Sequence, residues 1–167
     1  MRTGHAVQKI AVALGMKVII AERKGEEKVR EGRVAFTDAL KQATVFMLTA
    51  PLVDSTSEMF STEEFEMMDK SSFLINVGRG GLVNEAALAK ALKERTISGA
   101  ATDVFQTEPA DRSNCPLLKE ELPNLVLTPH VAWYTAASMR KVAERMWESL
   151  EAFAKGEPVN VVYRGKL

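Results

Sequence analysis

The chain has 167 residues, 46% of them hydrophobic and 26% charged, which fits one globular domain with a sizeable core and excludes a disordered chain. Its 22 basic and 22 acidic side chains balance, which argues against nucleic acid and against an anionic membrane surface as partners. No apolar run is long enough to span a bilayer and no signal-peptide core is present, so we expect a soluble cytoplasmic protein.

Helical and extended patterns alternate from the first residue onward. Apolar residues at helical spacing or capping residues predict helices at 4–14, from 38, from 61, after 84 and at 135–155. Short apolar runs predict strands at 16–21, at 44–49, from Phe73 toward Arg79, at 97–104 and at 125–128. The order of strand, helix and strand predicts an α/β fold with a doubly wound parallel sheet.

The connections between these elements also carry information. The charged segment 23–32 predicts a loop or a frayed helix, and Pro51 ends the strand before it because proline cannot continue a ladder. The segment 105–123 contains three prolines and is long enough to be a functional loop. His5 and His130 lack a metal-ligand spacing, so we predict no metal site, and the single Cys115 agrees with a reducing compartment.

Arg79 stands between glycines at the end of a buried strand. Ligands of parallel sheets bind beyond the carboxyl ends of the strands, where Gly78, Gly80 and Gly81 would let a molecule approach the backbone. A guanidinium binds a planar carboxylate through two parallel hydrogen bonds, which predicts a small carboxylic acid as the ligand. The alternative is an arginine in an ordinary surface turn.

Three motifs resemble the signatures of the D-isomer-specific 2-hydroxyacid dehydrogenases, in that family's order and spacing. They are Asn76-Val-Gly-Arg79-Gly-Gly, Asp103-Val-Phe-Gln-Thr-Glu108-Pro and Leu127-Thr-Pro-His130. The segment 51–56 is similar to the family's loop after the fourth strand. Residues 21–25 and 129–133 look most like the glycerate dehydrogenase (hydroxypyruvate reductase) branch. The resemblance implies a Rossmann-like domain of an NAD-dependent oxidoreductase, which in this family is usually dimeric.

Carried over by position, the resemblance implies three catalytic residues. Arg79 would bind the carboxylate and carbonyl of a 2-oxo acid, and His130 would be the acid or base at the C2 oxygen. Glu108 would pair with His130, which fixes the imidazole tautomer and favours its charged form. The substrate pair would be glycerate and hydroxypyruvate, or glycolate and glyoxylate. Taken singly, His130 could be a core histidine and Glu108 a solvated loop acid.

The resemblance also implies a set of cofactor contacts. Glu22, after the strand at 16–21, is placed to accept hydrogen bonds from the adenosine ribose and would repel the 2′-phosphate of NADP, which favours NAD. Arg23 and Lys24 could soften that preference or form a solvated turn. The remaining predicted contacts are Gly4, Pro51, Val77, Gly78, Arg79, Asp103 and His130, and Asp103 could instead be a turn former at the strand end.

The chain departs from the family's pattern at its start. Of the Gly-x-Gly-x-x-Gly fingerprint only the last glycine, Gly4, is present, and the first strand is absent. We therefore expect residues 1–155 to be an incomplete dinucleotide-binding domain with a tail at 156–167 and no separate substrate domain. Such a chain could be a fragment of an enzyme, an engineered chain or a protein that has given up catalysis. The expected function is NAD-dependent hydride transfer, with little activity from these residues alone; the alternative is a non-catalytic NAD-sensing or dimerising module.

Overall fold

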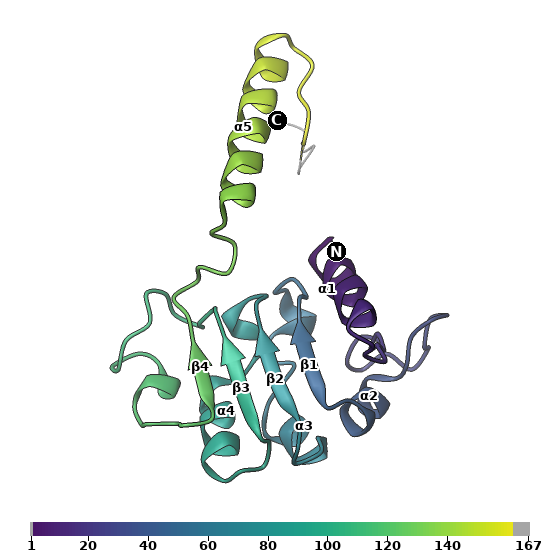
Figure 1. The fold of residues 1–167 in the computed structure, drawn as a ribbon, viewed down its shortest axis with the longest axis vertical. Helices are drawn as coiled ribbons and strands as arrows, with labels where there is room; N and C mark the ends of the chain where they lie inside the picture. Colours follow the sequence, from purple (N-terminus) through teal and green to yellow (C-terminus); the bar gives the residue numbers. More distant parts are fainter. Residues whose placement is uncertain (1, 162–167) are drawn as a thin grey trace. The chain divides into compact units, whose positions relative to one another are not determined.

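A computed structural model describes residues 2–161 of the chain, except for the side chain of Arg2. The chain divides into two compact units, one ending at His130 and one starting at Val131. The first unit holds four parallel strands in the order β1-β2-β3-β4 (Figure 1). They are β1 (Val45–Leu48), β2 (Phe73–Asn76), β3 (Gly99–Thr102) and β4 (Leu125–Leu127). The predicted α/β parallel sheet is therefore confirmed.

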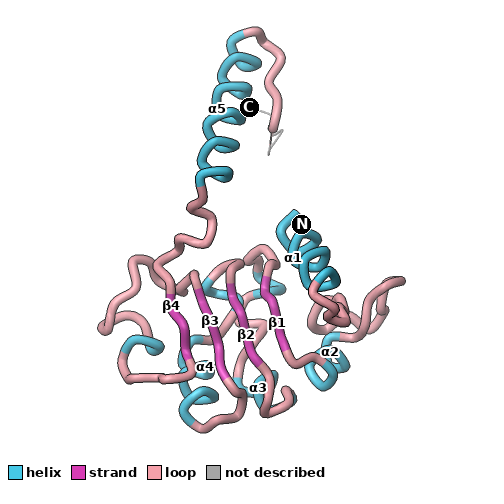
Figure 2. Tube along the Cα trace, viewed as in Figure 1, coloured by secondary structure: helices cyan, strands magenta, loops and turns pink. Residues whose placement is uncertain are grey.

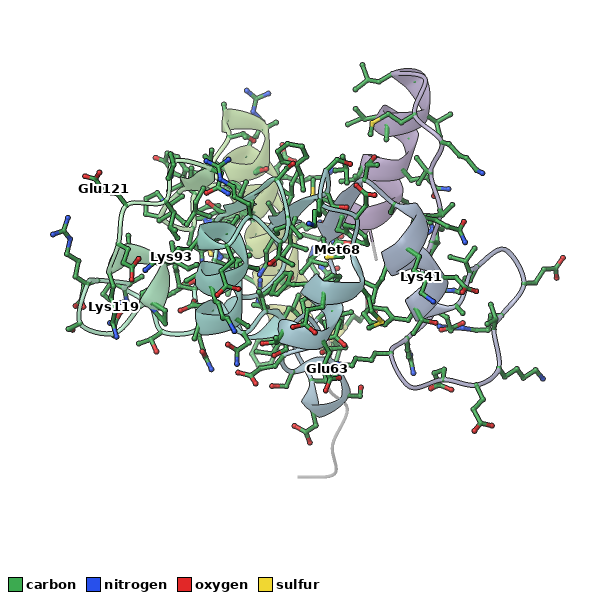
Figure 3. The ribbon with its side chains drawn as sticks, turned by 90° about the horizontal axis from the view of Figure 1, so that it is seen from below. Lys41, Glu63, Met68, Lys93, Lys119 and Glu121 are labelled. Atoms are coloured by element: carbon green, nitrogen blue, oxygen red, sulfur yellow. The ribbon has the colours of Figure 1, made fainter. Side chains whose placement is uncertain are left out.

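Helices precede and connect the strands of this sheet. They are α1 (Arg2–Ala13), α2 (Phe36–Gln42), α3 (Thr62–Met67) and α4 (Glu85–Lys93), with short 3-10 turns η1 (Asp54–Thr56), η2 (Gly80–Leu82) and η3 (Pro116–Leu118). Connections between neighbouring parallel strands are right-handed, which places α3 and α4 on one face of the sheet, where they contact each other. Figure 3 shows Glu63 of α3 pointing outward, while Met68, next to the end of that helix, is buried.

The starts of α3 and α4 follow the predicted capping patterns. The Glu64 carboxylate accepts a hydrogen bond from the Ser61 main-chain N–H at 2.9 Å, which is one half of the predicted capping box. The Asn84 side-chain oxygen accepts from the N–H of Ala87 at 2.9 Å. Behind these caps, Leu88 and Leu92 of α4 are buried against the sheet, as the apolar spacing predicts.

The predicted strand at 16–21 is wrong. Residues 16–20 form no strand, and Ala21 makes a single parallel bridge to Val34. The pairing consists of two hydrogen bonds, from the Glu22 N–H to the Val34 carbonyl at 2.8 Å and from the Val34 N–H to the Ile20 carbonyl at 3.0 Å. The pairing cannot continue toward the C-terminus beyond Ala35, because the helix α2 begins at Phe36.

The strand predicted at 44–49 is present as β1. Among the described residues β1 is an outer strand, and its Val45 and Met47 are exposed. Ile10 and Leu14, expected on the apolar face of the first helix, are exposed as well.

The second unit contains α5 (Ala136–Ala154), close to the predicted 135–155. Thr135 caps it by accepting a hydrogen bond from the Ser138 N–H at 3.1 Å. Five large apolar residues of α5 at helical spacing are exposed: Met139, Val142, Met146, Leu150 and Phe153. No helix in the described part of the chain is long and apolar enough to cross a membrane.

Candidate active site

The carboxyl ends of the four strands meet at one edge of the sheet. The register pairs Leu48 with Asn76, Asn76 with Thr102 and Thr102 with Leu127, so the strands end side by side. Figure 2 shows the loops that leave this edge in pink. The predicted residues Pro51, Val77–Arg79, Asp103 and His130 all follow a strand end within three residues. The topology therefore gathers most of the predicted site residues at one edge.

Arg79 is held at this edge by a network around Asn76. The buried Asn76 side chain donates to the Arg79 carbonyl at 2.9 Å and accepts from the Gly78 N–H at 3.1 Å. The Arg79 guanidinium donates to the Gly78 carbonyl at 2.7 Å, and the side chain is exposed. The turn thus places an exposed guanidinium on a backbone that the Asn76 side chain holds in place. The role of Asn76 was not predicted, although the residue stands directly before Val77-Gly78-Arg79 in the motif.

The glycines around Arg79 are required by packing. A Cβ on Gly78 would lie 3.1 Å from the Ala50 carbonyl oxygen and 2.9 Å from Leu82 Cδ1. A Cβ on Gly80 would lie 1.9 Å from the Phe105 carbonyl carbon. We expected Gly80 to leave space for a ligand. That space is filled by the chain itself, because the loop after β3 packs against this turn.

Glu108 and His130 form a direct pair between the loops after β3 and β4. His130 Nδ1 lies 2.7 Å from Glu108 Oε2, and the Phe105 N–H donates to Glu108 Oε1 at 2.9 Å. These side chains are partly exposed, His130 to 39% and Glu108 to 36%. The hydrogen bond with His130, then the one from Phe105, holds the pKa of Glu108 below its ordinary value, and the nearby charge of Arg79 lowers it further.

The backbone of His130 has an unusual conformation. Its φ of 54° lies in the left-handed region, which few residues other than glycine adopt. Its N–H donates to the Thr128 carbonyl at 3.0 Å, which closes a tight turn directly after β4. This turn directs the imidazole toward Glu108. A strained backbone at a hydrogen-bonded carboxylate–imidazole pair is typical of a functional site.

Asp103 is buried at the end of β3, with 4% of its surface exposed. Its N–H donates to the Asn76 carbonyl at 3.0 Å, and the Thr128 hydroxyl donates to Oδ1 at 2.5 Å. Asp103 thus links the ends of the strands on both sides of β3. The contact with Thr128 was missed from the sequence, because nothing in their spacing of 25 residues indicates it.

Glu22 has protein partners for both carboxylate oxygens. Arg30 binds it through the guanidinium group, with Nε 2.8 Å from Oε2 and Nη2 on Oε1, and the Arg23 N–H donates at 2.9 Å. The hydrogen bond from Arg30 keeps the pKa of Glu22 far below its ordinary range. The role of Arg30 was not predicted, because several cations in the loop 23–32 could have paired with Glu22.

Two predicted cofactor contacts lie near the end of β1. Gly4 belongs to the first turn of α1, and a Cβ there would lie 3.0 Å from Thr49 Oγ1. The Pro51 carbonyl accepts a hydrogen bond from the Thr56 hydroxyl at 2.8 Å. The start of α1 therefore lies against the end of β1, on the same side of the sheet as the loop that contains Pro51.

Comparison with known proteins agrees with this arrangement. Residues 2–132 match the family model of the D-isomer specific 2-hydroxyacid dehydrogenase, NAD binding domain. A glycerate dehydrogenase from Methylorubrum extorquens is 42% identical over 159 residues, which cover 95% of this chain and 49% of that enzyme. A glyoxylate reductase from Thermococcus litoralis is 39% identical over 171 residues, 99% of this chain and 50% of that enzyme.

A solved structure gives the same result at the level of the fold. The NAD-complexed D-isomer specific 2-hydroxyacid dehydrogenase from Lactobacillus delbrueckii ssp. bulgaricus is 32% identical, with a TM-score of 0.79, and the match covers 96% of this chain and 52% of that one. The chain spans about half the length of the curated relatives it matches. Since the family model covers well over half of its residues, the chain belongs to the D-isomer specific 2-hydroxyacid dehydrogenases, in the NAD-binding domain of that family.

Proposed function

We propose that the chain is the cofactor half of an enzyme that transfers a hydride between NAD(H) and a small D-2-hydroxy acid or its 2-oxo acid. The observation that carries this proposal is the 2.7 Å contact between Glu108 and His130, which lies close enough to Arg79 for its charge to lower the pKa of Glu108. An acid–base pair beside an exposed guanidinium is the arrangement that reduction of a carbonyl next to a carboxylate requires.

His130 is the proposed acid in reduction and the proposed base in oxidation. When bound, NADH supplies the hydride to C2 of the 2-oxo acid, which leaves negative charge on the carbonyl oxygen. A proton from the imidazole neutralises that oxygen, and Glu108 on Nδ1 stabilises the charged ring and orients Nε2 toward the substrate. Arg79 binds the substrate carboxylate and stabilises the developing charge.

The residues at the carboxyl edge fit the nicotinamide end of NAD. Asp103 offers a buried carboxylate to the nicotinamide carboxamide, and the backbone at Pro51 and Val77–Gly78 lies along the same edge. At the adenosine end Glu22 is the proposed ribose acceptor. Since Arg30 already binds its carboxylate, a ribose must share Glu22 with this guanidinium or displace it.

Glycerate with hydroxypyruvate and glycolate with glyoxylate are the proposed substrate pairs. Support comes from the two relatives described above, a glycerate dehydrogenase and a glyoxylate reductase. We further propose that residues 1–155 serve as the cofactor domain and act together with a separate substrate domain. The complete enzyme would be a homodimer in a reducing compartment such as the cytoplasm, which the buried free thiol of Cys115 favours.

A chimeric enzyme tests this proposal. The part of the Methylorubrum extorquens glycerate dehydrogenase that this chain matches would be replaced by the matching residues of the chain. We expect the chimera to oxidise NADH with hydroxypyruvate or glyoxylate, and the 167-residue chain alone to do so slowly or not at all, because the chain matches only 49% of the length of that enzyme. A folded chimera that binds NADH but turns over neither acid would contradict the proposal and favour a non-catalytic NAD-sensing module.

A further inference from the structure

Glu85 is a buried carboxylate outside the proposed catalytic set. It is the first residue of α4, directly after the cap Asn84, and only 4% of its surface is exposed. Its Oε1 accepts a hydrogen bond from the main-chain N–H of Gln106 at 2.6 Å. Burial of a carboxylate is costly unless hydrogen bonds and the positive end of a helix offset it, so this contact has to be retained.

The same loop is held by a second contact. The backbone of Gly80 packs so closely on Phe105 and Gln106 that a Cβ on Gly80 would lie 2.0 Å from the Phe105 carbonyl oxygen and 2.4 Å from the Gln106 nitrogen. Gly80 is the first residue of the turn η2, and Glu85 lies three residues after the end of that turn. The segment 79–85 therefore contacts the Phe105–Gln106 peptide at two residues, Gly80 and Glu85.

Cys115 packs beside Glu85 and closes the cluster. It is 1% exposed, and burial raises the pKa of its thiol to about 11, with further contributions from the charge and hydrogen bond of Glu85. The thiol is therefore protonated at neutral pH and can donate to the Glu85 carboxylate. Glu85 thus joins three parts of the chain: α4, the loop after β3 and the residue before η3.

The Phe105–Gln106 peptide directly follows the peptide whose N–H orients Glu108. The N–H of Phe105 donates to Glu108 Oε1, while Glu108 Oε2 lies on His130 Nδ1. Two successive amides in this loop therefore bind two different carboxylates, that of Glu108 on one side and that of Glu85 on the other. A shift of the loop away from Glu85 would move the amide that holds Glu108 in place.

We propose that Glu85 is a positioning residue that fixes the Phe105–Gln106 peptide, so that Glu108 stays aligned on His130 relative to Arg79. Its catalytic meaning rests on the proposed function. The geometric claim stands separately, because it concerns contacts within the first unit and requires neither cofactor nor turnover.

Amide hydrogen exchange in the 167-residue chain, read by NMR, tests the proposal. We expect Glu85→Ala to raise the exchange rate of the Phe105 amide at least tenfold relative to that of Leu74, a buried residue of β2 that reports opening of the sheet. Glu85→Gln keeps an oxygen that can accept from Gln106 and should restore most of the protection. Glu94→Ala, which removes an exposed carboxylate at the other end of α4, should leave Phe105 within twofold of wild type.

Glu85→Asp provides a second route if Glu85→Ala does not fold. Its carboxylate is one methylene too short to reach Gln106, so we expect the same local acceleration at Phe105. Two results would overturn the proposal: unchanged Phe105 exchange in the folded variants, or equal acceleration at Phe105 and Leu74, which indicates a general loss of stability. Loss of the proposed acid–base function would instead appear in turnover and leave these exchange rates as predicted.

Discussion

Glu108 is ionised more readily in the folded chain than in the unfolded one. Its folded pKa is lowered, first by the hydrogen bond with His130 and then by the Phe105 N–H, whereas an unfolded glutamate titrates near pH 4.3. A lowered folded pKa contributes stability above the unfolded pKa, and that contribution is lost as the pH falls through the folded pKa. Because Glu108 is partly exposed, solvent screening keeps the contribution small.

This difference predicts how stability depends on pH. From about pH 5 down to pH 3, the urea midpoint of the wild-type chain should fall more steeply than that of Glu108→Gln, whose side chain does not titrate. Glu22, Asp69 and Asp111 also have lowered pKa values, but they are common to both proteins, so the difference between the two slopes isolates Glu108. Parallel slopes would show that the contact with His130 does not stabilise the carboxylate.

Single residues were predictable from the sequence where motifs named them. Arg79, Glu108 and His130 came from the three motifs, and their common edge follows from the parallel strands. The contacts that orient them did not, because Asn76 acts through backbone groups and Glu85 reaches a loop 21 residues away. Arg30 was missed for a similar reason: spacing does not decide which cation of a charged loop binds Glu22.

At the scale of elements, the turn after β2 and the loop after β3 are packed against each other without spare space. Gly80 and Gly81 are neighbours in η2, but a Cβ on Gly80 would meet the Phe105 backbone at 1.9 Å, whereas one on Gly81 would meet the end of the flexible Leu52 side chain at 2.9 Å. Backbone cannot move aside as a side chain can, so these two positions should respond differently to the same substitution.

We therefore expect Gly80→Ala to lower the free energy of unfolding by about 1–3 kcal/mol, the usual cost of overpacking. Gly81→Ala, the matched control, should cost much less, because the Leu52 side chain can rotate away. Urea unfolding of both variants at neutral pH measures the difference. Equal costs at the two positions would show that the loop after β3 does not pack on Gly80 as the structure has it.

The predicted elements differ in how local their causes are. Helix starts at Ser61 and Asn84 were predictable because capping depends on residues three positions apart. The strand predicted at 16–21 was not formed, although its pattern is as apolar as that of β2. A strand needs partners from distant parts of the chain, and within residues 2–161 the pairing of this segment is a single bridge from Ala21 to Val34. An apolar run does not show whether it has a partner to pair with, so it does not by itself show whether a strand forms.

At the scale of the whole molecule, the parallel sheet brings the proposed site residues together. Aligned strand ends bring residues from four loops to one edge, although Arg79 and His130 are 51 positions apart in the sequence. The pattern of strands and helices predicted a parallel sheet, and the register confirms that the four strands end side by side. The substrate was not predictable from these residues, which span about half the length of the relatives they match.

The measurement that tests the central claim most directly is turnover of His130→Gln in the chimera with Methylorubrum extorquens glycerate dehydrogenase. If His130 transfers the proton, kcat with hydroxypyruvate or glyoxylate should fall by about 100-fold or more, while the Kd for NADH stays within about threefold of that of the parent chimera. A His130→Gln chimera that binds NADH and retains most of the parent kcat would contradict the assignment of the Glu108–His130 pair as the acid–base centre.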